Sequence, residues 1–201
     1  ESWGGKMISI DVSLDERQLQ FMRDTLGRFP EKAKKAAVRA INRAVEGART
    51  DTVKKVCEEY VIKPSDVRKT IHIVRAKSDR LTAQVISEGR PIPLIKFNVK
   101  PKKPPAKGTH VVDRKTVIAG VKFGSAKEMP HSFITEMKSG HVGVFSRVNN
   151  APRLPIEQKY GPSVPQMVGS KDVINFIEKR ARERLDKELR HQITYLLGGG
   201  K

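Results

Sequence analysis

Residues 30–60 repeat small and apolar side chains at three- and four-residue steps, the spacing of one face of an α-helix. Pro30 suits the first turn of such a helix, and Pro64 breaks the pattern after it. At ~1.5 Å per residue the helix would be a rod of roughly 45 Å. Small side chains would let a second helix or a sheet approach it closely, and the stripe comprises Ala33, Ala37, Ala40, Ile41, Ala44, Val45, Ala48, Thr52, Val56 and Tyr60.

Two further segments have helical patterns. Residues 15–26 follow Ser13 and Asp15, either of which could cap a helix. Ser170 is placed to cap a last helix over residues 171–197. Acidic and basic residues mix on one face of that helix, which indicates a solvated surface. Its other face carries an apolar stripe made of Ile174, Ile177, Ala181, Leu185, Leu189, Ile193 and Leu196.

Short runs of alternating apolar and polar residues predict β-strands elsewhere in the chain. Prolines near the start of residues 92–99 indicate an edge strand or an extended entry to one, and residues 77–80 are expected to form a turn between two antiparallel strands. We expect all the strands to join one sheet. They cover residues 7–12, 71–76, 81–87, 92–99, 109–112, 116–123 and 140–148, and residues 133–137 add another strand or a turn.

These elements predict an α+β fold, in which an antiparallel or mixed β-sheet is packed by a long N-terminal helix and a C-terminal helix. An exposed basic loop and a proline-rich arm complete the prediction. A length of 201 residues fits one domain, which we assign to residues 13–197. Residues 1–12 are then an N-terminal extension with a short strand, and residues 198–201 a flexible tail.

Two groups of basic residues are candidate contact sites. The loop at residues 100–108, KPKKPPAKG, contains no acid and carries Lys100, Lys102, Lys103 and Lys107. The long helix carries a basic stripe made of Lys32, Lys35, Arg39 and Arg43. A net charge of +18 favours polyanions or acidic protein surfaces. Each group is therefore either a solvated surface or a contact to DNA, to the lumen of an assembly or to an acidic partner. Aromatic residues make up only 5% of the chain, which argues against readout of stacked bases.

A proline-rich arm occupies residues 150–167. Each proline fixes φ and removes a backbone donor, so we predict neither a helix nor a central strand there. An extended arm with little freedom loses little entropy on docking, and it either docks on another subunit or lies on its own domain. We expect that deletion of residues 154–167 leaves the fold intact. The candidate docking residues are Pro152, Leu154, Pro155, Ile156, Tyr160, Pro162, Val164, Pro165 and Met167.

The sequence shows no pattern of catalytic or cofactor-binding residues. It contains no glycine-rich phosphate loop, no HExxH and no GxSxG motif. His131, Glu136 and His141 lie close in sequence, but their spacing matches no standard set of metal ligands. The single cysteine, Cys57, fits a buried structural thiol. No run approaches eighteen apolar residues, so we expect no membrane span. We predict a protein with no catalytic activity, cofactor or metal.

The order of three segments resembles the minor tail protein Z family of tailed bacteriophages and prophages. The first segment, at residues 29–71, is a basic, alanine-rich helix followed by IKPSDVRKTI. The second is GVFSR at residues 143–147, and the third is PIEQKYGPSVPQM at residues 155–167. The resemblance extends over roughly residues 13–197 and rests on the order of the segments, because no single residue is diagnostic.

The resemblance implies a structural virion protein that acts in tail completion at the head-proximal end of the tail, in the neck or connector region, after assembly in the host bacterial cytoplasm. The implied partners are tail terminator, tail tube or neck proteins. Since the tail tube is sixfold, we expect a ring of identical subunits, first of all a hexamer. The end of the packaged genomic DNA is a further candidate partner, through nonspecific contact. The alternative is a free-standing basic protein that binds nucleic acid without sequence specificity.

Overall fold

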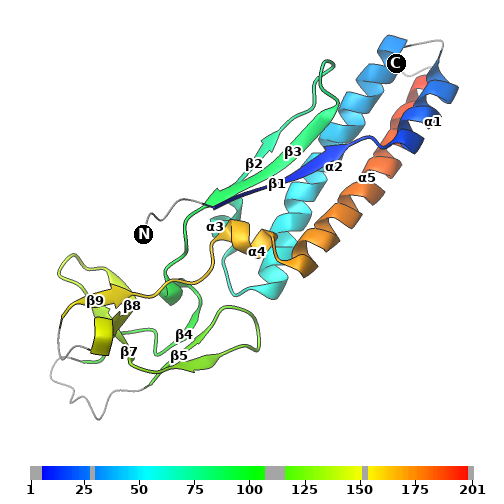
Figure 1. Ribbon diagram of the computed structural model, residues 1–201. Coiled ribbons are helices and arrows are strands. Elements are labelled where there is room, and N and C mark those ends of the chain that lie inside the picture. Colours follow the sequence, from blue (N-terminus) through cyan, green and yellow to red (C-terminus); the bar gives the residue numbers. More distant parts are fainter. Residues whose placement is uncertain (1–5, 28–29, 107–115, 151–153, 199–201) are drawn as a thin grey trace.

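The computed structural model describes residues 6–27, 30–106, 116–150 and 154–198. The described chain is elongated, with long helices at one end and small β-sheets at the other (Figure 1). The described residues between 92 and 161, which lie between β3 and α4 in the chain, form this β end. The predicted strand at residues 109–112 lies outside the described residues.

Two long helices, α2 (Pro30–Glu59) and α5 (Lys171–Leu197), run side by side in opposite directions (Figure 1). Ala40, Ala44 and Ala48 of α2 are completely buried, which confirms the predicted stripe. Gly47 has no side chain, which leaves room for the Arg184 side chain of α5 to cross α2 at this position. The Arg184 guanidinium then donates to the Asp51 carboxylate at 2.9 Å. Close packing of the two helices thus follows directly from the small residues.

A short helix, α1 (Glu16–Leu26), packs against the end of this pair. Asp15 caps it, accepting from the Gln18 backbone N–H at 2.8 Å, and the Gln18 side chain accepts from the Asp15 N–H at 2.9 Å. This capping box satisfies two backbone donors that a helix start leaves without partners. Met22 and Leu26 fill the contact with the long helices.

The first sheet lies against the long helices and has the strand order β1-β3-β2. It contains β1 (Lys6–Ser13), β2 (Ile71–Val74) and β3 (Thr82–Gly89), and every residue of β1 pairs with β3. Alternate residues such as Ile10, Val12 and Val85 are buried. The strands and the intervening turn confirm the prediction for these segments.

A single turn of helix, α3 (Pro64–Arg68), connects α2 to β2. Lys63 occupies the cap position and no side chain caps the helix. Pro64 lies in the first turn, where its lack of an N–H costs no hydrogen bond.

The β end contains two further three-stranded antiparallel sheets, with orders β4-β5-β6 and β7-β8-β9. The strands are β4 (Asn98–Lys100), β5 (Val117–Gly120), β6 (Lys127–Met129), β7 (Ser132–Glu136), β8 (Val142–Arg147) and β9 (Ile156–Gln158). A 3₁₀ turn, Leu94–Lys96, precedes β4, and a kinked turn at Val148–Asn150, where Asn149 has a φ of 51°, connects β8 towards β9. The predicted fold class is confirmed, but the strands form three small sheets instead of one, because those of the β end have three to six residues and pair with near neighbours in sequence.

Three connections join the β end to the helices. The chain enters and leaves it side by side, with Gly161 donating to the Ile92 carbonyl at 2.8 Å. The end of α2 makes the third connection, because the Val61 N–H donates to the Val121 carbonyl at 2.9 Å. Lys122 also lies over the Tyr60 ring, 5.1 Å from its centroid. The C-terminal end of α2 is therefore anchored in the β end.

The prediction that the proline-rich arm contains no helix is wrong at its C-terminal end, where residues Val164–Val168 form α4. Ser163 and Gln166 form a capping box, and Pro165 lies in the first turn. The missing N–H of a proline in that turn has no intrahelical partner to lose. The proline therefore helps to start this helix, although the same residue would break one in its interior.

Candidate assembly surfaces

The structure divides the proline-rich arm into an exposed part and a buried part. Leu154 and Tyr160 are exposed, at 67% and 43% of their surface. Pro155 is also exposed, and Ile156 and Pro162 are half-buried. Pro152 lies outside the described residues. The remaining candidates, Val164, Pro165 and Met167, are buried in the core of the same chain.

The middle of the arm is paired with its own sheet. Ile156 lies opposite Arg147 and Gln158 opposite Phe145, so β9 is an edge strand beside β8. The pairing continues past the strand, where Lys159 donates to the Val144 carbonyl at 2.8 Å. The exposed Leu154 side chain thus lies just before the ordered edge strand β9, and the exposed Tyr160 side chain lies just after it.

The residues of the basic stripe of α2 are exposed, and they differ in their ionic partners. Lys32, Lys35 and Arg39 are exposed. Arg43 is exposed as well, but its guanidinium lies 3.3 Å from the Glu188 carboxylate of α5. The last residue of the stripe therefore has an acidic partner within the chain.

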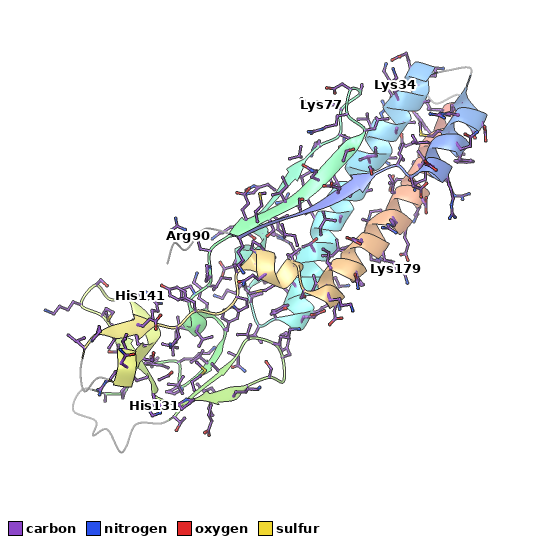
Figure 2. All side chains as sticks on the ribbon, in the orientation of Figure 1. Lys34, Lys77, Arg90, His131, His141 and Lys179 are labelled. Atoms are coloured by element: carbon purple, nitrogen blue, oxygen red, sulfur yellow. The ribbon has the colours of Figure 1, made fainter. Side chains whose placement is uncertain are left out.

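Sequence reasoning missed a second set of cations beside this stripe, on the turn between β2 and β3. Lys77 and Arg80 close this turn through backbone hydrogen bonds of 2.9 and 3.0 Å. Figure 2 shows Lys77 and Lys34 at the same end of the molecule. The alternating pattern predicted the turn, but nothing in the sequence indicates which helix it lies against.

The basic loop extends from the β end. Lys100 is the last residue of β4, and Lys102 and Lys103 follow it, all three exposed. Lys107 lies outside the described residues. Thirteen lysines and arginines but only four acidic residues occur between residues 91 and 161. The β end therefore has a strong positive charge, separate from that of α2.

The polar residues considered for chemistry have ordinary surroundings. Cys57 is half-buried, and its burial raises the pKa of the thiol, with Arg68 acting in the opposite direction. The His141 ring nitrogen lies 3.0 Å from the Gln158 amide, and the ring makes an edge contact with Phe145. Within the described ranges, no three histidine, cysteine or acidic side chains are grouped to hold a metal ion. A raised thiol pKa disfavours the reactive thiolate.

Comparison with known proteins bears on the identity of the chain. Among the described helices, none is both long enough and apolar enough to cross a membrane. No curated protein and no solved structure matches the sequence. The model of one family, prophage minor tail protein Z, matches residues 24–198, which include all of α2, α5 and the β end. The chain therefore belongs to the prophage minor tail protein Z family and is a structural protein of the phage tail.

Proposed function

We propose that the protein acts in tail completion at the head-proximal end of the tail, where copies of it form a ring and dock on terminator, tube or neck proteins. Membership of a tail protein family supports the tail setting. The observation that carries the docking proposal is the set of exposed apolar side chains at the β end. Phe123, Leu154 and Tyr160 are exposed at 62%, 67% and 43%. Exposed apolar and aromatic side chains of this kind anchor protein interfaces.

The exposed part of the arm, from Leu154 to Tyr160, is the docking element in this proposal. Its backbone is already ordered by pairing of β9 with β8, so docking would cost little additional entropy. The buried part of the arm belongs to the core, because Val164 and Met167 have 1% and 0% of their surface exposed. We therefore expect deletion of residues 154–167 to unfold the protein, contrary to the expectation from sequence.

A ring needs a heterologous interface, in which one surface of a subunit meets a different surface of its neighbour. The elongated molecule has two different ends, one built of small β-sheets and one of long helices, and each could supply one of the two surfaces (Figure 1). The sixfold symmetry expected for a tail tube makes a hexamer the first stoichiometry to test. A free-standing nucleic-acid-binding protein is the weaker alternative, because the family match supports a tail component.

Substitution at the docking element tests the proposal. We expect Leu154→Glu to prevent incorporation into tails, since the exposed leucine would no longer bury its side chain on a neighbour. Leu197→Glu is the matched control, because Leu197 is also an exposed leucine, at 60%, but lies at the end of α5. Circular dichroism of both purified variants reports whether each is folded. Normal incorporation of folded Leu154→Glu protein would exclude this docking element.

Imaging tests the location independently. We expect a gold label on the C-terminus of the protein to appear at the head–tail junction of negatively stained particles. A label at the distal tip, or along the whole tail, would exclude a role in completion. Mass measurement of the purified assembly gives the number of subunits, and a stable monomer at high concentration would contradict self-assembly without a partner.

A further inference from the structure

We propose that α2 and the β2–β3 turn together form a binding surface for the phosphate backbone of duplex DNA. This surface, which we call the tip cluster, consists of Lys35, Arg39, Lys77 and Arg80. The inference deepens the proposed tail function by naming a polyanionic partner for one end of the molecule. It rests on how the structure brings the two elements together, on their unpaired charge and on the absence of apolar anchors.

The turn is held against α2 by one side chain. The Asn42 amide donates to the Ala76 carbonyl at 3.1 Å and accepts from the Ala76 N–H at 2.8 Å. One helical turn away, Glu46 pairs with Arg75. Residue numbers therefore rise along β2 as they fall along α2, so the two elements run in opposite directions.

This opposite direction places the cations of both elements side by side. A strand advances ~3.3 Å per residue and a helix ~1.5 Å, so the turn beyond Ala76 lies beside the helical turn that precedes Asn42. That turn of α2 contains Arg39, and Lys35 follows one turn further along the same face. Lys77 and Arg80 therefore extend the basic surface of α2 sideways, and a single surface results.

The tip cluster has a surplus of positive charge. Within the described part of the chain, Lys35, Arg39, Lys77 and Arg80 take part in no ion pair. By contrast, the face of α2 towards α5 is neutralised, through Arg43 with Glu188 and Arg184 with Asp51. The chain thus compensates its cations between the helices and leaves them uncompensated at the tip, where Asp79 is the acidic residue of the turn.

The surroundings of the tip cluster favour DNA over an acidic protein. Protein interfaces need apolar or aromatic anchors. Among the described residues, the exposed large apolar side chains belong to other elements, with none on α2 or the β2–β3 turn. Contact with phosphates needs only long, positively charged side chains and no apolar anchor, and it does not depend on the DNA sequence. The lack of aromatic side chains also favours a duplex over a single strand, whose bases stack on aromatic rings.

Salt-dependent binding of the full-length protein to a short mixed-sequence DNA duplex tests the proposal. The cluster variant replaces all four residues, as Lys35→Gln, Arg39→Gln, Lys77→Gln and Arg80→Gln. The control variant has the same net charge but replaces four exposed cations of α5, as Lys171→Gln, Lys179→Gln, Arg182→Gln and Lys187→Gln. Lys179 marks this separate surface in Figure 2. Circular dichroism confirms that both variants fold before binding is compared.

We plot the logarithm of the association constant against the logarithm of the salt concentration. The cluster variant should reduce the magnitude of this slope by about three to four, because it loses four cations and each lost phosphate contact removes about 0.9. The control variant should keep the slope of the unmodified protein. An equal loss in both variants would show that net charge alone drives binding, and an unchanged cluster variant would exclude the surface. Poly-glutamate binding that matches duplex binding at equal salt, and falls equally in the cluster variant, would overturn the choice of DNA. None of these outcomes alters the imaging test of the tail location.

Discussion

The crossing of Arg184 over Gly47 predicts how the substitution Gly47→Ala changes the stability of the helix pair. A Cβ atom added at Gly47 would lie 2.1 Å from Nε and 2.2 Å from Cδ of Arg184. Both atoms are in the middle of the side chain, and the guanidinium beyond them is held by Asp51 at 2.9 Å. In Gly47→Ala, Arg184 must therefore leave this position and release Asp51.

Two opposing terms set the size of the effect. Replacing glycine by alanine inside a helix stabilises it by about 0.5–1 kcal/mol. Loss of a hydrogen bond between charged groups costs about 1.5–3 kcal/mol, and the Asp51 side chain is only 14% exposed, so water replaces its partner poorly. We expect Gly47→Ala to lower the free energy of unfolding by about 1–2 kcal/mol, or a few degrees in Tm for a chain of this size.

A double-mutant cycle separates the two terms. In an Arg184→Ala background the obstacle is absent, so Gly47→Ala should stabilise by about 0.5–1 kcal/mol. The same substitution thus changes sign between the two backgrounds. The measurement is the free energy of unfolding from urea titrations followed by circular dichroism. Stabilisation by Gly47→Ala in both backgrounds would refute the reasoning, because it would mean that Arg184 moves aside without cost.

Three further outcomes are expected. Asn42→Ala should remove both hydrogen bonds to Ala76 and speed amide exchange in the β2–β3 turn, and unchanged exchange would show that the turn is held by other contacts. Met167→Ala should destabilise by about 2–5 kcal/mol because the side chain is completely buried, whereas Leu154→Ala should change stability by less than about 0.5 kcal/mol in the same urea titration. A reversed order of these two effects would contradict the division of the arm. Iodoacetamide should alkylate Cys57 more slowly in the folded protein than in urea at the same pH, because burial raises the pKa of the thiol, and equal rates would contradict this.

Helices could be predicted from this sequence far better than the arrangement of sheets. The spacing of Ala37, Ala40 and Ala44 describes one buried face whatever lies against it, so α2 and α5 follow from local pattern alone. The alternating pattern of a strand does not indicate which other strand it pairs with. Pairing of β1 with β3, across some seventy residues, confirmed the expected antiparallel sheet, but the division of later strands into two separate sheets depends on contacts that alternation does not encode.

The sequence predicted which basic residues are exposed, but not which residues of other elements lie beside them. Lys32, Lys35 and Arg39 are exposed, as a basic stripe suggests. The partner of Arg43 and the neighbouring turn with Lys77 could not be predicted, because both arise from tertiary packing. In the arm, the proline count hid the capping pattern of Ser163 and Gln166, which was present in the sequence and predicts a helix start.

The anchoring of α2 at two places along its length has a mechanical consequence. Asn42 ties its N-terminal half to the β2–β3 turn, and Glu59 and Tyr60 tie its other end to the β end through Lys122. A continuous helix is stiff over ~45 Å, because bending it strains every hydrogen bond along one side. The tip cluster and the β end are therefore mounted on one stiff element, so a displacement of one surface is transmitted to the other.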